Sequence, residues 1–507
     1  MQVPTTITDR DEVQSKILKA SEILYSMAKA GYGPGAGNAI LGFKHGPPLL
    51  SRDGVTNIKQ VRDVDPFIDD DIQAIRQASE KNNQKVGDGT TAVTILIHHL
   101  LLLAQKLEGK GFKPMEIASK IKEAETVVLD LIEKTKIPIG NRLKQVATVS
   151  AGDPDLGMMI ADVMKEIGKD GGVLIEQYEG LGVHNEIIDG FYFHKGYKDT
   201  ELITDPTQNQ SNHYDVNILI SNKTFNTNVD LAPVLQAISE EGIKQLVIIG
   251  EVGNEALEVL KLAKGKGLMM VTAVDPPYTV GGRTLFLEDI ALMTNGTIYN
   301  GVDFTTNMLG RAKEVLVTEH ATTIIDGEGS KKDVKKRVEA LKVQLKEEAH
   351  PQSIQFIKDR LGRLTNKMAI IKVGGAVEFE RDEVKLRVQD AVCACQSALK
   401  DGILPGGGVF LARVKGTEFD DAFKQPFKQL VDNSGLNPEA LLGSLEATGT
   451  WFGFNLRNIT DKPVNLLEEG ILDPSLVIKE VVTNACSIVG KLITASAQTA
   501  WGTDDKS

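Results

Sequence analysis

The fold of this chain is decided by the stretch Gly87-Asp88-Gly89-Thr90-Thr91, which leads directly into the apolar run Ala92-Val93-Thr94-Ile95-Leu96. The glycines allow backbone amides to approach a ligand closely, and the helix expected to follow directs its unpaired N–H groups to the same point. That helix end carries partial positive charge, which favours phosphate. Phosphate would repel the aspartate unless a cation lay between them. The stretch therefore predicts a metal-bridged nucleotide site; the alternative is a glycine turn with a threonine N-cap.

The composition describes a globular protein with more than one domain, because 507 residues are too many for one ordinary core. The net charge of -12 argues against a nucleic-acid or membrane partner, since either would need a basic face. Cys393, Cys395 and Cys486 imply no disulfide framework and are interpreted as buried small hydrophobes. No signal peptide is visible, and the apolar run from Ala92 to Ala104 is too short to span a bilayer. We expect a cytoplasmic protein in which this run is a core helix.

Apolar periodicity divides the chain into helical flanks around an α/β middle. Near the N-terminus it predicts helices over 9–30, 69–86 and 90–107, with a projecting hairpin around Gly46-Pro47-Pro48. In the middle it predicts strands at 216–220 and 245–250, helices at 231–241 and 254–264, and a charged helical pair over 330–365. Glycine-rich stretches lie both early (31–37, 87–91) and late (405–408). If these form one site, a middle domain is inserted into another domain, and the two ends of the chain come together.

At this point the sequence resembles a GroEL-type (group I) chaperonin over nearly its whole length. Any one of the motifs is weak, but their shared order is specific. They are Gly33-Pro34, Arg52-Asp53-Gly54-Val55, Gly87-Asp88-Gly89-Thr90-Thr91, Val149-Ser150-Ala151, Thr323-Ile324-Ile325-Asp326-Gly327, Ile371-Lys372-Val373-Gly374, Arg387-Val388-Gln389-Asp390-Ala391, Gly406-Gly407-Gly408-Val409 and Gly470-Ile471-Leu472-Asp473-Pro474.

The resemblance implies a multidomain α/β chaperonin fold. A helical equatorial ATPase domain would comprise residues 1–134 and 401–507. A small α/β intermediate hinge domain would comprise 135–188 and 368–400, and an inserted α/β apical domain, 189–367, would bind non-native protein.

The resemblance also implies the roles of individual residues in binding ATP and Mg²⁺. Asp88 looks like the Mg²⁺ ligand, with Thr90 and Thr91 on the phosphates, which fits the oxygen-rich coordination of Mg²⁺. Asp390 would orient or deprotonate the attacking water once the intermediate domain closes, and Asp53 would assist at the metal or the water. For Asp53 the alternative is a turn residue. The remaining nucleotide contacts implied are Gly33, Pro34, Arg52, Gly87, Gly89, Ser150, Gly407, Asn455, Ile471 and, at the ribose, Asp473.

The phosphate loop departs from the family. It usually reads Thr-Leu-Gly-Pro-Lys-Gly-Arg, whereas here it reads Gly31-Tyr32-Gly33-Pro34-Gly35-Ala36-Gly37, so glycines replace two basic residues. Backbone amides still cradle phosphate, but each missing cation costs on the order of 1 kcal/mol of binding. Arg52 replaces the usual lysine. We expect weaker ATP affinity without loss of activity, because Asp53, Asp88 and Asp390 remain.

The apical face and the assembly surfaces also differ. Client contacts implied by the resemblance are Tyr197, Leu202, Leu235, Leu257 and Leu262. Ala232, Glu201 and Lys261 replace larger apolar side chains, so we expect weaker client binding and leave the use of a co-chaperonin lid open. The alternative for these leucines is ordinary amphipathic-helix core. Asn437 replaces the acidic partner of Lys428 at the expected ring–ring contact, so we expect a homo-oligomeric ring, seven-membered by resemblance, that is single or weakly paired.

The sequence thus predicts an ATP-dependent ring chaperonin that assists protein folding in a chamber, with hydrolysis gated by intermediate-domain closure. Its divergence suggests a specialised or virus-encoded member. The alternative is a ring-forming holdase or scaffold with a weakened ATPase, which Gly35 and Gly37 favour and the retained aspartates oppose.

Overall fold

The computed structural model describes residues 6–500 except 43–48, 52–53, 169–170, 179, 278–279, 349, 366, 376 and 459–461. The chain forms two compact units. The first contains residues 1–164, 177–183 and 373–507, and the second contains 165–176 and 184–372. The second unit is therefore inserted into the first, and the two ends of the chain come together as predicted.

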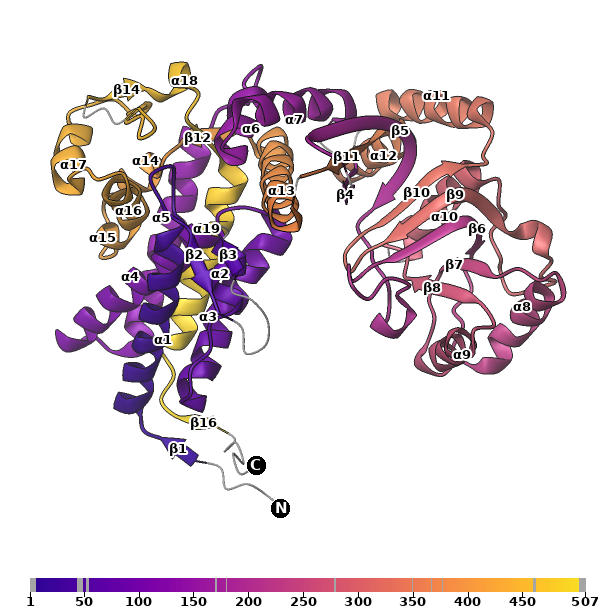
Figure 1. Ribbon diagram of the computed structural model, residues 1–507, viewed down its shortest axis with the longest axis horizontal. Helices are drawn as coiled ribbons and strands as arrows, with labels where there is room; N and C mark the ends of the chain where they lie inside the picture. The colour runs from indigo at the N-terminus through magenta and orange to yellow at the C-terminus, as the bar shows by residue number, and fades with distance from the viewer. Residues whose placement is uncertain are drawn as a thin grey trace. The chain divides into compact units, whose positions relative to one another are not determined.

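The first unit is built on a bundle of long helices: α1 (Arg10–Ala30), α3 (Pro66–Val86), α4 (Thr90–Gly109), α5 (Pro114–Thr135) and α19 (Ser475–Leu492) (Figure 1). One apolar core joins all five, and it includes Leu24, Leu96, Val128 and Val481. Among the described residues α4 is the helix long and apolar enough to cross a membrane, but its apolar window is 67% buried inside the protein. It is the core helix that the sequence predicts, because the other bundle helices surround it.

Three smaller groups of elements also belong to this unit. Helix α13 (Glu378–Asp401) packs against α6 (Leu143–Ala151), with α7 (Pro154–Ile167) following α6. Strand β12 (Ile403–Pro405) pairs with β15 (Leu472–Pro474). The segment between them folds on its own small core and contains α14 (Val409–Ala412), α15 (Asp420–Phe423), α16 (Gln425–Asn433), α17 (Pro438–Glu446), β13 (Phe452–Gly453), β14 (Val464–Asn465) and α18 (Leu466–Glu469).

Short strand pairs lie near the ends of the chain. Strand β1 (Thr6–Thr8) pairs with β16 (Gln498–Ala500), which fixes the N-terminal and C-terminal segments side by side. Strands β2 (Ala39–Leu41) and β3 (Leu49–Ser51) form the predicted hairpin, and helix α2 (Gly54–Lys59) follows it. The Gly-Pro-Pro centre of this hairpin lies outside the described residues.

The second unit is a mixed sheet covered by helices on both faces. Its strand order is β4 (Val173–Gln177), β11 (Lys367–Val373), β5 (Val183–Phe193), β10 (Thr322–Gly327), β9 (Gly310–Val317), β6 (Ser211–Ile220), β7 (Gln245–Ile249) and β8 (Met270–Val274). β6, β7 and β8 are parallel, whereas β5, β10, β9 and β6 are antiparallel.

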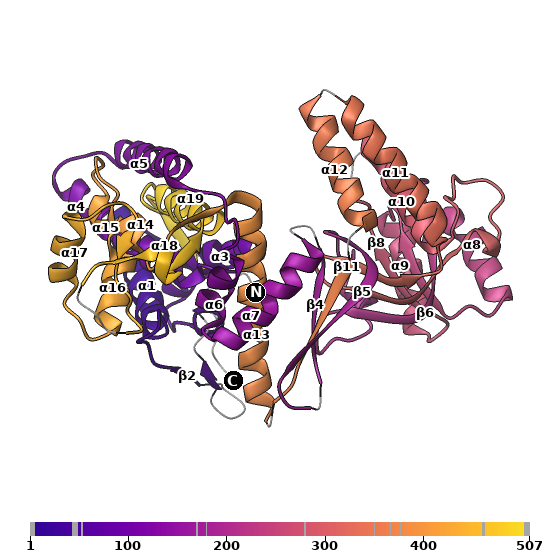
Figure 2. The ribbon, with the colours of Figure 1, turned by 90° about the horizontal axis from the view of Figure 1, so that it is seen from above.

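Two helical layers cover this sheet. Helices α10 (Val280–Thr294), α11 (Lys331–Glu347) and α12 (Pro351–Thr365) share one core with it. Helices α8 (Asn228–Glu240) and α9 (Asn254–Gly265) share another, together with the short turns η1 (Thr200–Leu202) and η2 (Thr306–Met308). Figure 2 shows α11 and α12 side by side as the predicted charged helical pair. The segments 135–188 and 368–400 are divided between the two units, and the three-domain division stays a prediction.

Candidate functional site

The loop before α4 is shaped so that its backbone and the Asp88 carboxylate meet at the helix N-terminus. Gly89 is the N-cap residue and has a φ of 78°, where only glycine is readily accommodated. A Cβ at Gly89 would also lie within 3 Å of Val477 and Val481 of α19. The Asp88 carboxylate accepts the Gly89 amide at 2.5 Å, and its backbone carbonyl accepts the Asn82 amide at 2.6 Å. The predicted glycine-rich loop is therefore fixed against two bundle helices, α3 and α19.

The hydroxyls of Thr90 and Thr91 face a second helix N-terminus. A Cβ placed on Gly54, the first residue of α2, would lie 2.1 Å from Thr91 Oγ1 and 3.3 Å from Thr90 Oγ1. Only a glycine permits so close an approach of the α2 backbone. The predicted site residues Arg52 and Asp53 come just before Gly54 and lie outside the described residues.

Asp473 brings a second carboxylate to this place from the far end of the sequence. It lies in β15 opposite Leu404 of β12, and the amides of Gly407 and Gly408 donate to its carboxylate. Both glycines have positive φ values, 66° and 72°, which turn successive amides toward one acceptor. Burial and, after it, the Asp88 charge raise the pKa of Asp473 to about 7, although the two backbone hydrogen bonds oppose the rise. A cation bound near Asp88 would reduce this unfavourable interaction between the two carboxylates.

Asp390 joins the same neighbourhood through α13. Cys393 lies one helical turn after it, and the charges of both Asp390 and Asp88 act on the Cys393 thiol. Burial raises the pKa of that thiol to about 12, and the two carboxylates add to the effect. Cys395 and Cys486 are buried as predicted, whereas Cys393 is only partly buried. The Asp88 charge thus acts on Asp473, and the Asp88 and Asp390 charges act together on the Cys393 thiol, which relates all three carboxylates to the region at the N-terminus of α4. Within the described ranges no group of three or more His, Cys, Asp or Glu forms a ready-made metal cage.

The glycine-rich loop 31–37 crosses the C-terminal end of α16. A Cβ on Gly33 would overlap the Leu430 side chain, which explains the glycine there. The Asn433 side-chain amide donates to the carbonyls of Lys29 and Tyr32, both at 2.8 Å. Asp473 and Asp88 both act on the Tyr32 phenol, so this loop borders the carboxylates. Pro34 is exposed.

The remaining predicted nucleotide contacts lie around β15 and α6. The Gly406 amide donates to the Ile471 carbonyl at 3.0 Å, and a Cβ on Gly407 would contact the Ile471 side chain at 3.7 Å. Ser150 lies on α6, which packs against β15, and its hydroxyl is buried with no hydrogen-bond partner among the described atoms. An orphaned buried hydroxyl of this kind fits a missing ligand. Asn455 instead donates to Glu469 at 2.8 Å and caps its own loop.

The predicted client contacts in the second unit do not share one surface. Leu202 is 0% exposed and Leu257 is 6% exposed, so both belong to the core between the sheet and α8 and α9. Both leucines lie where the alternative interpretation of an amphipathic-helix core would place them, and their contact with clients stays a prediction. Tyr197 and Leu235 are half-buried, and Leu262 is 57% exposed.

Lys261 precedes Leu262 on α9 and links this helix to the segment around η1 through ion pairs. Its ammonium group lies 2.7 Å from Asp199, 3.1 Å from Glu258 and 3.3 Å from Glu201. These hydrogen-bonded carboxylates, Asp199 first, raise the pKa of Lys261. The face beside Leu262 is therefore more polar than an apolar client groove.

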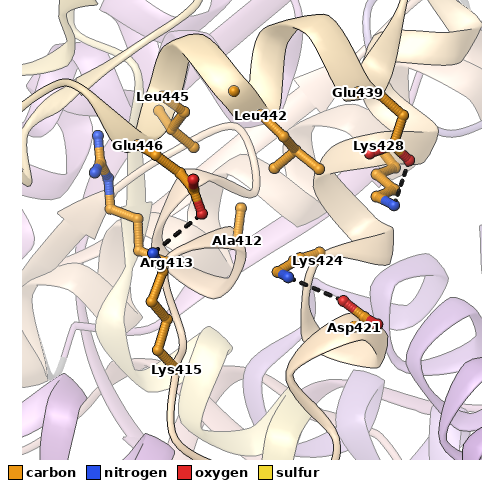
Figure 3. Close-up of a pocket in the computed structure, with 11 residues that line it drawn as sticks. Ala412, Arg413, Lys415, Asp421, Lys424, Lys428, Glu439, Leu442, Leu445 and Glu446 are labelled. Carbon is orange, nitrogen blue, oxygen red and sulfur yellow. Dashed lines mark hydrogen bonds and ion pairs between the residues drawn. The ribbon is translucent and has the colours of Figure 1, made fainter.

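A separate cavity of about 360 Å³ lies among α14, α15, α16 and α17 (Figure 3). Three lysines in its wall are paired with carboxylates, namely Lys415 with Glu446, Lys424 with Asp421 and Lys428 with Glu439. None of the predicted site residues lines it, so we do not assign the nucleotide site to this cavity. Asn437 caps α17, and Lys428 bonds within its own chain.

Both the sequence and the architecture are similar to those of known proteins. The sequence matches the model of the TCP-1/cpn60 chaperonin family over residues 24–417 and 413–497. The structure is similar to a crystal structure of the chaperonin gp146 from the bacteriophage EL 2 (Pseudomonas aeruginosa) in the presence of ATP-BeFx. The TM-score is 0.79 at 19% sequence identity, over 98% of this chain and 99% of that chain. This likeness confirms the predicted fold.

Proposed function

The chain belongs to the TCP-1/cpn60 chaperonin family, and from that premise we propose that it is a ring chaperonin that binds and hydrolyses ATP to assist protein folding. The observation that carries the proposal is the electrostatic relation of Asp88, Asp390 and Asp473 to the region at the N-terminus of α4. The similar phage chaperonin was crystallised in the presence of ATP-BeFx, which supports nucleotide as the ligand.

The residues around α4 suit a phosphate chain with a divalent cation. The α4 N-terminus, the Thr90 and Thr91 hydroxyls and the loop amides would hold phosphate oxygens. Asp88 would supply one carboxylate ligand to Mg²⁺, which prefers a few carboxylates together with phosphate and water oxygens. Bound there, Mg²⁺ would neutralise developing charge on the phosphates. Asp473 and Ile471 would border the nucleoside, with Ser150 beside them.

Asp390 is the residue we assign to the hydrolytic step. It would accept a hydrogen bond from the attacking water and orient it toward the terminal phosphate, because its helix carries it to the edge of this carboxylate group. We propose that Asp53 assists it. As the family resemblance implies, closure of the intermediate hinge domain would gate this step.

The remaining parts of the function are proposed on the family's general behaviour. The protein would form a cytoplasmic homo-oligomeric ring, bind non-native proteins through exposed apolar side chains of the second unit such as Leu262, and release them into a chamber. Ring size, ring pairing and a co-chaperonin lid belong to this proposal. A holdase or scaffold with a weakened ATPase is the second candidate, favoured by Gly35 and Gly37.

Asp390→Ala separates the two candidates. We expect the variant to bind Mg-ATP as the wild type does and to lose about 10²–10⁴-fold in the rate of phosphate release, as for removal of a general base. Glu383→Ala, an exposed carboxylate on the same helix, is the matched control and should leave the rate unchanged. Wild-type turnover that survives in Asp390→Ala would remove Asp390 from the hydrolytic role. A wild type that binds nucleotide without turnover would favour the holdase.

A further inference from the structure

Arg283 is a buried cation at the carboxyl edge of the parallel strands β6, β7 and β8, which lie side by side in the second unit (Figure 1). It is the fourth residue of α10 and is only 8% exposed. Because side chains on a helix lean toward its N-terminus, Arg283 reaches back to the connection after β7, where its Nη1 atom lies 2.9 Å from Glu251. The carboxyl edge of parallel strands is where α/β sheets commonly bind ligands.

The other two guanidinium nitrogens of Arg283 form an edge without a partner. The Nε and Nη2 atoms are buried and make no hydrogen bond to any described atom. These two atoms lie on one side of the planar guanidinium, and their parallel N–H groups match the two oxygens of a carboxylate. The same unit shows this edge in its satisfied form, since the Nε and Nη2 atoms of Arg360 donate to the two oxygens of Asp289 at 2.8 and 2.7 Å. Arg283 presents the same pair of donors without an acceptor.

The carboxylates that follow β7 and β8 already bind other donors. One oxygen of Glu251 faces Arg283 Nη1, and the other accepts the Thr224 hydroxyl at 2.8 Å. Asp275 accepts the Lys198 ammonium group with both oxygens, at 2.8 and 2.9 Å. Neither carboxylate can serve the Nε and Nη2 edge of Arg283 without losing one of these bonds. Because buried charged donors are rarely left unpaired, this edge requires an acceptor that the described part of the chain does not supply.

The acceptor that fits this edge is a carboxylate. Its two oxygens have the spacing of the two N–H donors, and its charge is opposite to that of the guanidinium. The side chain of Glu251, on the third nitrogen of the same guanidinium, is 47% exposed, so the site lies just below the surface. We propose that Arg283 binds a carboxylate, either of a small acid or of a peptide chain end, at the carboxyl edge of β6, β7 and β8. This site is in the second unit, so it does not depend on the proposed nucleotide site in the first unit.

Arg283→Lys tests the proposal because it keeps a positive charge for Glu251 and removes the two-donor edge. The probe is sodium acetate at constant ionic strength, and saturation-transfer NMR on the full-length protein detects its methyl group when it binds. We expect the Kd for acetate to rise about tenfold in Arg283→Lys, as for the loss of one charge-assisted hydrogen bond. Arg337→Lys is the matched control, because Arg337 also pairs with a carboxylate, Glu288 at 3.1 Å, and its Kd should equal that of the wild type. Acetamide, which has the shape of acetate without its charge, should not bind.

Acetate that binds the wild type and Arg337→Lys alike, and Arg283→Lys more weakly, supports the proposal. Equal Kd values for Arg283→Lys and the wild type overturn it, because the acetate then binds adventitiously elsewhere. A wild type that binds no acetate also overturns it and leaves an ordered water as the partner of Arg283. If a thermal melt shows that Arg283→Lys is unfolded, Glu251→Gln is the second test. It keeps the edge and removes a competing negative charge, so acetate should bind more tightly, and weaker binding overturns the proposal.

A competition experiment identifies the source of the carboxylate. N-acetyl-glycylglycine, which has a free carboxylate, should displace acetate if the natural ligand is a peptide chain end, whereas its carboxamide should not. Displacement by the acid alone supports the site and assigns it to chain ends. Displacement by neither compound supports the site for small free acids. Equal displacement by the acid and the carboxamide overturns the proposal, because the edge of Arg283 would then not select for a carboxylate.

Discussion

Replacement of Asp473 by asparagine should stabilise the nucleotide-free protein at alkaline pH. Asp473 is partly buried and interacts with the Asp88 charge, and its pKa rises from 3.8 to about 7. The folded state therefore holds a proton that the unfolded chain has already released. Between about pH 4 and pH 7 the free energy of unfolding falls as the pH rises. Above about pH 7 the folded protein carries the full cost of ionising Asp473.

The size of this cost follows from the shift. A rise of the Asp473 pKa from 3.8 to about 7 lowers the free energy of unfolding at pH 8 by about 4 kcal/mol. Asparagine removes the charge but accepts the Gly407 and Gly408 amides less strongly than a carboxylate does, which returns about 1–2 kcal/mol. We expect a net gain of about 2 kcal/mol, or a rise of about 4 °C in the melting temperature for a unit of this size.

Thermal melts of Asp473→Asn and the wild type at pH 8 and pH 5, without nucleotide or divalent cation, measure the effect. The gain should be present at pH 8 and be close to zero at pH 5, where only about 1–2 kcal/mol of the cost remains and the weaker hydrogen bonds of asparagine offset it. Asp421→Asn is the matched control: its ion pair with Lys424 at 2.9 Å lowers the Asp421 pKa, so its loss gives no gain at pH 8. A variant that melts no higher than the wild type at pH 8 would refute the reasoning about the Asp88–Asp473 pair.

Three further predictions concern other parts of the chain. The thiol of Cys395, whose pKa burial raises to about 12, should react with a disulfide reagent at pH 8 about a thousandfold more slowly than in the urea-unfolded chain; equal rates would contradict its burial. Gly35→Ala should lower the stability by about 1–3 kcal/mol in a urea titration, and Gly37→Ala should cost nothing, because only the first Cβ meets backbone. Lys261→Leu should improve suppression of aggregation of an unfolded protein, because it replaces a charge at the α9 edge with apolar surface; no improvement would place client binding elsewhere.

The secondary structure of this protein follows closely from its sequence. The predicted helices 9–30, 69–86 and 90–107 correspond to α1, α3 and α4, and the predicted strands at 216–220 and 245–250 lie within or along β6 and β7. Strong apolar periodicity explains this agreement, since each element buries one face. The meeting of the chain ends was predictable as well, because the glycine-rich stretches lie at both ends.

Side-chain environments were harder to predict, because they depend on contacts between distant segments. The apolar stripe of α9 could not reveal whether Leu257 faces the sheet or the solvent, and it faces the sheet. The interaction of Asp473 with Asp88 depends on how α19, which follows β15, packs against the start of α4, and no local pattern encodes that packing. The glycine at position 35 could not be explained from the sequence either, since only its contact with Asn433 and Ser434 at the end of α16 shows why a side chain is unfavourable there.

The central claim is that this chaperonin couples Mg-ATP hydrolysis to a change of its assembly. Phosphate release by the purified full-length protein, recorded alongside negative-stain microscopy with and without Mg-ATP, tests it most directly. We predict measurable turnover and rings whose shape changes with Mg-ATP. Rings that are indifferent to nucleotide and release no phosphate would contradict the claim.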